Sequence, residues 1–391
     1  MNKVNFLIVS DLHSTVEEEL KDSKLIFHPK TQTSEHANAF INYVKELGKD
    51  IDYLVCPGDI SNKGDVDGFK AGWSFLHELK DQVGASNLLC VPGNHDHQSR
   101  PGEQFSVIHE LKFIQPSFPT NCHQSNTMFW GWHWMHQEFD KFNLIKLNSS
   151  AYHGINDEYK HGRVAVETSD QIHDYLKSQQ FEEKEFNILL CHHHPIPMDD
   201  VDETFDYEVM EGGQHLLKKL DEANVGPWLV VHGHKHFASV SHGMTQRSTP
   251  PVIFSAGSLG ASLYPQIEDR TANQFYILTV DLDKTSHEGC LVGTFEAYSW
   301  NLMNGWHPSQ CNHLPHKGGF GAPKKPHALI RELKELLTKG TYLDKTDLAS
   351  VQSEIDYYTP GQFKELLEKM DKLSIQFEYQ GNEILEVASN E

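Results

Sequence analysis

The sequence lacks several patterns that mark whole classes of protein. Its six cysteines fall singly, with no pair in a C-x-x-C arrangement, and three lie inside apolar runs. We therefore expect them to be small buried hydrophobes in a reducing compartment rather than zinc ligands or disulfides. No apolar run approaches the 18 residues of a membrane span. The opening MNKVNFLIVSDLH lacks the basic and then apolar pattern of a secretory signal, which predicts a cytoplasmic protein without a membrane partner.

Positive charge is also scarce. The chain carries 33 Lys and Arg against 55 Asp and Glu, a formal net charge of −22 over 391 residues, and it has no run of five basic residues. A nonspecific nucleic-acid binder normally shows a basic face, so this composition disfavours nucleic acid as a partner. Histidine, in contrast, is abundant at 26 residues. The places where histidines cluster are therefore where coordinating chemistry is expected.

Short apolar segments rich in β-branched residues alternate with helical patterns. Several segments are apolar throughout, as strands covered on both faces tend to be. Apolar residues at 3/4 spacing predict helices over 34–48, 65–81 and 167–179, the first with Ser34 as its cap and Gly48 at its end. The alternation predicts a layered α/β fold. The predicted strands are residues 4–10, 51–56, 87–91, 142–148, 186–191, 228–233, 251–257, 275–280 and 291–298.

Polar ligand residues follow five of these strands directly. In α/β folds the carboxyl ends of the strands gather at one edge, so these side chains are expected to meet. Each motif alone also fits ordinary turn and capping chemistry, but five in one chain favour a shared site. The motifs are SDLH with Asp11 and His13, PGDIS with Asp59, PGNHDH with Asn94, His95 and Asp96, HHHP at 192–195, and HGHKH with His234 and His236.

The residue types indicate a metal centre. Carboxylates, imidazoles and one amide suit divalent Mn, Fe or Zn, and the thiolates of a structural zinc site are missing. Seven ligands are too many for one tetrahedral ion, so the economical interpretation is two divalent metal ions that share a carboxylate. Two such ions can bind a bridging hydroxide and coordinate the oxygens of a phosphoryl group.

The ordered motif set D-x-H, GD, GNH[DE], H-x-P and GHxH resembles the calcineurin-like metallophosphoesterases over roughly residues 4–300. The resemblance implies a four-layer αββα sandwich with a dinuclear centre, here followed by a small, mainly helical C-terminal extension. It also implies a role for each motif residue. Asp11, His13 and His236 would hold one ion, Asn94, His193 and His234 the other, and Asp59 would bridge them.

The same resemblance implies the catalytic groups. His95 would stabilise charge beside the scissile phosphate and protonate the leaving oxygen, and Asp96 would orient His95. His193 is chosen from three adjacent histidines because the family ligand usually lies two residues before the proline. His194 would then face substrate or solvent.

The implied function is a metal-dependent phosphodiesterase that acts on a small nucleotide-type diester through a metal-bridging hydroxide, similar to the class III cyclic-nucleotide phosphodiesterase branch. A DNA or RNA nuclease is the alternative, and a scaffold that keeps the fold without catalysis is a third. Trp130, Trp132 and Trp134 alternate in an insertion of about 45 residues. On an extended segment they would form one face on which a base stacks, whereas core packing of a lid is the other interpretation.

We expect three parts along the chain. Residues 1–315 form the catalytic domain, the Gly-, Pro- and His-rich residues 316–327 a linker, and residues 328–391 an accessory segment with helical spacing. Because the last segment is too short for a thick core, we expect it to pack on the catalytic domain, to self-associate or to bind a protein partner.

Overall fold

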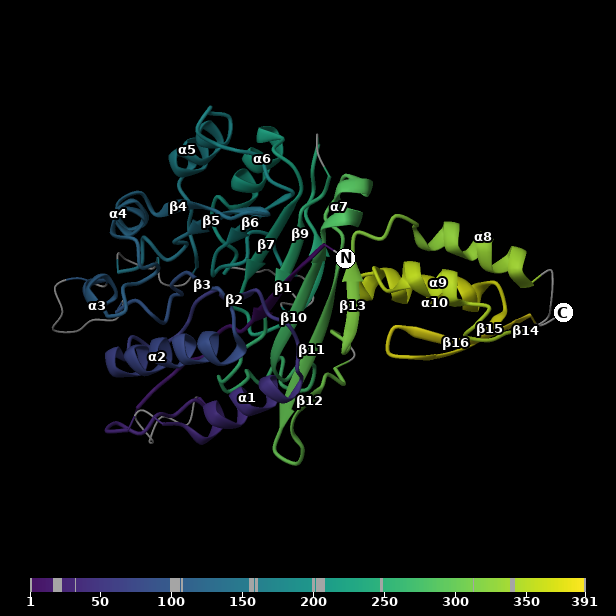
Figure 1. Ribbon diagram of the computed structural model, residues 1–391, viewed down its shortest axis with the longest axis horizontal. Helices are drawn as coiled ribbons and strands as arrows, with labels where there is room; N and C mark the ends of the chain where they lie inside the picture. Colours follow the sequence, from purple (N-terminus) through teal and green to yellow (C-terminus); the bar gives the residue numbers. More distant parts are fainter. Residues whose placement is uncertain are drawn as a thin grey trace.

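A computed structural model gives the fold of the chain (Figure 1). The structure describes residues 2–16, 23–31, 33–98, 106, 108–154, 158, 161–198, 201, 208–246, 249–311, 313–337 and 342–389. Two large sheets lie face to face, and a third, small sheet belongs to a separate C-terminal unit. Within the described ranges, none of the helices combines the length and the apolar composition that crossing a membrane requires.

The first sheet has seven strands. Strands β1, β2 and β3 are parallel, with β3 at one edge, and β10 pairs with β1 in the antiparallel sense. In spatial order the strands are β12 (Gly305–Pro308), β11 (Gly293–Asn301), β10 (Asn273–Asp281), β1 (Lys3–Ile8), β2 (Tyr53–Cys56) and β3 (Asn87–Cys90), with β13 (Lys317–Phe320) also on β11.

The second sheet has six strands, with β5, β6, β7 and β9 parallel at its centre. In spatial order the strands are β4 (Trp134–Glu138), β5 (Phe142–Leu147), β6 (Phe186–Leu190), β7 (Trp228–His232), β9 (Val252–Ser255) and β8 (Ser239–His242). All nine predicted strands are present in the two sheets, and β4, β8, β12 and β13 are additional.

Helices cover the outer face of each sheet, as Figure 1 shows. α1 (Glu35–Glu46) and α2 (Val66–Val83) pack on the seven-stranded sheet, and α5 (Val166–Leu176) and α6 (Gly213–Ala223) pack on the six-stranded sheet. The Ser34 side chain accepts from the Ala37 amide, which confirms the predicted cap of α1. The shorter helices are α3 (His109–Phe113), α4 (His123–Trp132) and α7 (Leu282–Glu288).

The core confirms the four-layer sandwich. Alternate residues of one strand enter different layers: Phe6 and Ile8 of β1 lie between the two sheets, whereas Leu7 lies beneath α1 and α2. Burial of both faces explains why these strands are apolar throughout. All six cysteines are free. Cys56, Cys90 and Cys191 are buried as predicted, whereas Cys122 is exposed and Cys290 and Cys311 are partly buried.

The C-terminal unit has helices and a sheet around a core of its own. Its helices are α8 (Pro326–Leu337), α9 (Ala349–Ile355) and α10 (Pro360–Lys372), and its strands are β14 (Tyr342–Leu343), β15 (Ile375–Gln380) and β16 (Glu383–Ser389). The extension is thus helical as predicted, with a three-stranded sheet in addition.

The C-terminal unit packs on the large domain through Tyr357 and Tyr358. The carbonyl of Tyr358 accepts from the Gly319 amide at 2.8 Å. The Tyr357 hydroxyl donates to Asp281 at 3.3 Å, and the Lys284 ammonium lies 4.0 Å from the Tyr357 ring centroid. Part of the predicted linker, Lys317–Phe320, is strand β13 of the large sheet and joins the two units closely.

Of the two interpretations of the tryptophan segment, the stacking platform is wrong. Residues 123–132 form helix α4 rather than an extended segment, so Trp130 and Trp132 point in different directions. Trp134 begins β4 and is buried beneath α5, and the Trp130 indole donates to the Phe118 carbonyl at 3.3 Å. Only Trp132 is largely exposed, at 57%. The alternative, core packing, holds for the other two.

Candidate metal centre

The predicted ligands converge at the carboxyl ends of five strands. β1, β2 and β3 of one sheet and β6 and β7 of the other end at this edge. Non-glycine residues rarely adopt positive φ, and such strain gathers at functional sites. Here five of the predicted ligands adopt it, namely Asp11, His13, Asp59, His234 and His236.

Asp59 lies at the middle of the cluster. Its Oδ1 accepts from the His95 amide at 2.8 Å. Its Oδ2 is 3.5 Å from Nε2 of His13 on one side and 3.3 Å from Nε2 of His192 on the other. One carboxylate oxygen therefore faces two groups of ligands, as the predicted bridge requires.

Gly93 makes this arrangement sterically possible. A Cβ at position 93 would collide with the backbone nitrogen and the side chain of Asp59. Only glycine, which has no Cβ, allows the two turns to approach this closely.

The first half-site contains Asp11, His13 and His236. Nε2 of His236 is 3.3 Å from Oδ1 of Asp11 and 3.1 Å from Nε2 of His13. The His234 amide donates to the Asp11 carboxylate at 3.1 Å, which fixes its orientation. All three side chains are buried, so their ligand atoms face one another rather than solvent.

The second half-site contains Asn94, His234 and His192. Oδ1 of Asn94 is 3.1 Å from Nδ1 of His234 and 3.0 Å from Nε2 of His192. Nδ1 of His192 is 2.9 Å from the carbonyl of Pro57. Because a carbonyl only accepts, Nδ1 carries a proton, and Nε2 points at Asn94 and Asp59. A histidine fixed in this way is typical of metal ligands.

His193, which the sequence motif predicts as the ligand at this position, has a different hydrogen-bond partner on its ring. Ser149 Oγ accepts from the amides of both His192 and His193, so its hydroxyl proton is directed to Nδ1 of His193 at 2.9 Å. That places the ring proton on Nε2, where it blocks metal binding. The geometry therefore favours His192, although His193 lies close enough to belong to the same group of ligand atoms. His194 is fully buried rather than facing solvent.

The donor set fits two divalent ions. With metal–ligand bonds of about 2.1 Å, neighbouring ligand atoms are expected roughly 3.0 to 3.4 Å apart. The separations within the two half-sites run from 3.0 to 3.5 Å.

Electrostatics keeps the carboxylates ionised. Burial alone would lower the pKa of His192, but Asp59 and Asp11 raise it to about 9. At neutral pH these two carboxylates therefore hold a proton on Nε2 of His192, and a divalent cation would take the place of that proton. Burial alone would raise the pKa of Asp59, but the neighbouring imidazoles, first His192, hold it well below its usual range. A ligand to a divalent cation has to be deprotonated, and the Asp59 carboxylate meets this requirement.

His95 and Asp96 lie beside the cluster. The His95 ring is 4.5 Å from the His13 ring, and its Nδ1 accepts from the Lys63 amide at 3.2 Å. Asp96 was expected to orient His95. Its carboxylate accepts from the Ser61 amide at 2.7 Å and from the Gly93 amide at 2.9 Å. Asp96 therefore holds the turn that carries His95, and burial, with the nearby Asp59, raises the pKa of Asp96 to about 7.

Sequence reasoning missed three groups around the centre. The Tyr264 ring stacks on His236 at 5.1 Å and is 47% exposed, so it borders the open side. Lys235 pairs with Glu208 at 2.7 Å beside His234. Ser149 follows β5, so it could have been predicted from the pattern that functional polar residues follow the strands. No motif marks Tyr264 or Glu208.

Comparison with known proteins agrees with this site. The model of the calcineurin-like phosphoesterase domain matches residues 4–238, which is more than half of the chain. The protein belongs to the calcineurin-like phosphoesterase family. Its members act as phosphoric ester hydrolases with divalent metals, and the candidate ligand clusters lie where the family motifs predict them. No curated protein matches the chain.

Solved structures of several phosphoesterases are similar at low sequence identity. The purple acid phosphatase PPD1 of yellow lupin (Lupinus luteus) has 15% identity and a TM-score of 0.48, with 76% of this chain and 52% of that chain covered. PhoD has 10% identity and a TM-score of 0.46, with 80% and 72% covered. YfkN of Bacillus subtilis has 10% identity and a TM-score of 0.35, with 78% and 88% covered. The chain thus spans about half the length of the lupin phosphatase.

Proposed function

We propose that this protein is a phosphodiesterase that requires two divalent ions, Mn, Fe or Zn, and that its substrate is a small nucleotide-type diester. The observation that carries the proposal is the position of Asp59 Oδ2, within 3.5 Å of a ligand nitrogen of each half-site. Asp11, His13 and His236 would hold one ion, and Asn94, His192 and His234 the other, with Asp59 shared. When bound, the two ions would supply Lewis acidity and an activated water.

His95 supplies the proton for the leaving oxygen. Since the Lys63 amide donates to its Nδ1, the neutral imidazole carries its proton on Nε2, on the opposite side of the ring. A general acid at this position is expected to contribute about 10²- to 10⁴-fold to the rate. The Asp96 carboxylate, fixed by Ser61 and Gly93, keeps this turn in place.

The charges around the centre support a diester over a monoester. The converging groups are carboxylates, imidazoles and one amide, and the lysine beside them, Lys235, is paired with Glu208. A diester carries one negative charge where a monoester carries up to two, so it needs less cationic support. The net charge of −22 also disfavours nucleic acid, the substrate of the alternative nuclease.

The test combines substrates with metal analysis. Full-length protein with Mn is assayed on bis-p-nitrophenyl phosphate, cyclic mono- and dinucleotides, p-nitrophenyl phosphate, and single- and double-stranded DNA. We expect diesters to be hydrolysed with higher kcat/KM than the monoester and DNA. A preference for the monoester or for DNA would contradict the proposal, and absence of stoichiometric metal in the folded protein would contradict the centre itself.

Two variants separate the roles of the residues. Asp59→Asn removes the charge of the bridge, so we expect loss of bound metal and of hydrolysis. His95→Ala keeps all ligands, so we expect full metal content with kcat reduced about 10²-fold or more. Equal metal loss in both variants, measured by elemental analysis, would show that this division of roles is wrong.

A further inference from the structure

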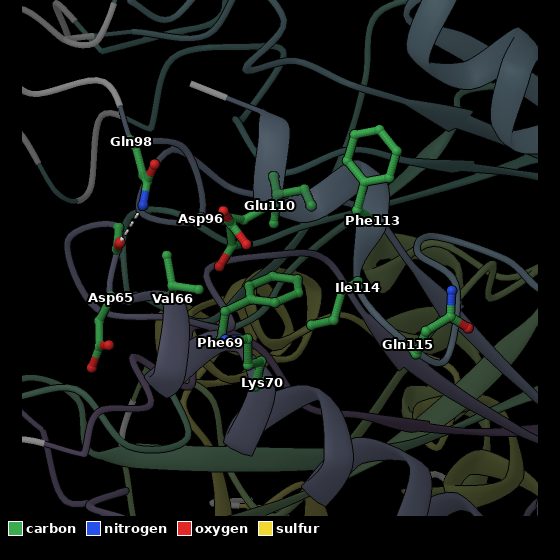
Figure 2. Close-up of a pocket in the computed structure, with 12 residues that line it drawn as sticks. Asp65, Val66, Phe69, Lys70, Asp96, Gln98, Glu110, Phe113, Ile114 and Gln115 are labelled. Atoms are coloured by element: carbon green, nitrogen blue, oxygen red, sulfur yellow. Dashed lines mark hydrogen bonds between the residues drawn. The ribbon is translucent and has the colours of Figure 1, made fainter. Parts of the chain in front are cut away.

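The cavity between α2 and α3 is not part of the metal centre (Figure 2). Its volume is about 200 Å³, and Figure 2 shows Phe69 from α2 and Phe113 from α3 among the side chains that line it. Neither His95 nor any proposed metal ligand is among the described residues that form its walls. Because the Lys63 amide donates to Nδ1 of His95, the proton on Nε2 points away from the cavity. Groups that contact the substrate are therefore expected on the open side of the centre itself.

A row of four aromatic rings crosses the first half-site. The centroid of the His95 ring lies 4.5 Å from that of His13, and the centroid of His13 lies 4.9 Å from that of His236. The Tyr264 ring follows at 5.1 Å from His236, and the planes of these two rings are only 11° apart. His95 and Tyr264 therefore flank the same pair of proposed ligands from its two ends.

The hydroxyl of Tyr264 is the end of the side chain that faces the centre. Although 47% of the side chain is exposed, burial of the hydroxyl raises the pKa of Tyr264 above its usual range. The charges of Asp59, Asp11 and Glu208 raise this pKa further. Glu208 lies 3.7 Å from Nε2 of His234 in the second half-site, whereas Asp11 belongs to the first. Since a like charge acts on a pKa in this way only from nearby, the hydroxyl lies close to both half-sites.

The backbone of Tyr264 is fixed, but its hydroxyl has no partner within the part of the chain that the structure describes. The Tyr264 carbonyl accepts from the amides of Ile267 and Glu268, both at 2.9 Å. The residue lies on the segment after β9, which is the parallel neighbour of β7, so it reaches the same edge of the sheet as the ligands. A donor held in place beside the centre can bind an oxygen of a ligand with little loss of conformational entropy.

We propose that the Tyr264 hydroxyl donates a hydrogen bond to a phosphoryl oxygen of the substrate, which makes Tyr264 a substrate-binding residue of this centre. The inference rests on the proposed phosphodiesterase function, but it concerns the phosphoryl group that monoesters and diesters share. Hydrogen bonds to a charged oxygen are roughly twice as strong as those between neutral groups. The ring stacks on His236 and the hydroxyl binds substrate, so the two parts of the side chain have separable roles.

Tyr264→Phe removes the hydroxyl and keeps the ring on His236. We expect the full-length, Mn-loaded variant, freed of excess metal, to bind inorganic phosphate roughly 10-fold more weakly in calorimetry, as the loss of one hydrogen bond to a charged group implies. The kcat/KM for bis-p-nitrophenyl phosphate should fall by a similar factor, with metal content unchanged. Tyr379→Phe removes the hydroxyl of a similarly exposed tyrosine in β15 of the C-terminal unit, and this matched control should change none of these quantities.

Tyr264→Ala separates a contact with substrate from simple coverage of His236. If Tyr264 only covered that ring, the Phe variant would match the wild type and only the Ala variant would lose metal, which would overturn the inference. Equal phosphate affinity in the wild type and Tyr264→Phe, no phosphate binding by the wild type, or metal loss in Tyr264→Phe would overturn it as well. Weaker phosphate binding by Tyr264→Phe in a protein that hydrolyses no diester would support the inference and contradict only the proposed function.

Discussion

At the scale of single residues, the three adjacent histidines after β6 show how hydrogen bonds select one ligand from equivalent side chains. His192 donates through Nδ1 to a carbonyl and turns Nε2 to the centre, whereas Ser149 directs its hydroxyl proton to Nδ1 of His193. The sequence offers the same imidazole three times. Only the partners of each ring decide which nitrogen carries the proton.

This difference predicts different metal contents for two variants. His192→Ala removes a ligand atom 3.0 Å from Asn94 and 3.3 Å from Asp59, so we expect it to lose about one of two bound ions and most activity. His193→Ala should keep both ions, because its Nε2 carries a proton. Elemental analysis of the two purified variants checks this, and Ser149→Ala serves as a control that leaves every ligand in place. Metal loss confined to the His193 variant would reverse the assignment.

At the scale of elements, strand β5 contains a charged residue where an apolar one is expected. Lys146 is fully buried, and its ammonium donates to the Pro119 carbonyl at 3.2 Å. Burial lowers the pKa of Lys146 to about 8. In the unfolded chain the pKa is higher, so between pH 8 and pH 10 the unfolded state binds more protons, and this residue makes the protein more stable as the pH rises.

Lys146→Met is therefore expected to raise the free energy of unfolding at pH 7 by about 1 to 2 kcal/mol, after allowance for the lost hydrogen bond to Pro119. This advantage should shrink as the pH rises from 8 to 10, because the wild-type lysine then becomes neutral in the folded state. Urea unfolding of both proteins at pH 7, 8.5 and 10 measures the difference in their free energies of unfolding. An advantage that does not depend on pH would show that packing, rather than charge, is responsible.

Strand β13 links the large domain to the C-terminal unit through a backbone contact that only glycine allows. A Cβ on Gly319 would lie 2.6 Å from Cα of Tyr357 and would collide with the carbonyl of Asp356. We expect Gly319→Ala to loosen the C-terminal unit, with faster amide hydrogen exchange in α9 and at residues 356–359 but with metal content unchanged. Gly361→Ala, in α10 of the same unit, would place its Cβ 3.9 Å from the nearest atom, Thr359 Oγ1, and is a control for local glycine effects. Unchanged exchange in α9 would mean that this contact does not hold the unit.

At the scale of the whole molecule, the proposed centre connects the two large sheets. Asp11, Asp59 and Asn94 extend from the seven-stranded sheet, whereas His192 and His234 extend from the six-stranded sheet. Ions bound between them would stabilise the folded state over the unfolded one, because the unfolded chain has no such site.

Metal removal should therefore lower thermal stability as well as activity. At a free metal concentration of 100 times Kd the stabilisation is about 2.7 kcal/mol, so we expect chelation to lower the Tm by several degrees and added Mn to restore it. Calorimetry with and without chelator measures the shift. The Tm of the Asp59→Asn variant should change little with chelator or with added Mn. If chelator left the wild-type Tm unchanged, the proposal that bound ions connect the two sheets would be wrong.

The amino-acid sequence by itself determined the layers of the fold and the edge at which the chemistry lies. Apolar periodicity reports burial on one or both faces of an element, and the carboxyl ends of parallel strands must share an edge, so nine strands and the Asp11, Asp59 and Asn94 motifs could be placed without coordinates. Only the tertiary structure decided between His192 and His193, made a helix of the tryptophan segment, and stacked Tyr264 on His236. These features depend on contacts between residues far apart in the chain, such as Pro57 with His192, and local sequence pattern carries no information about such partners.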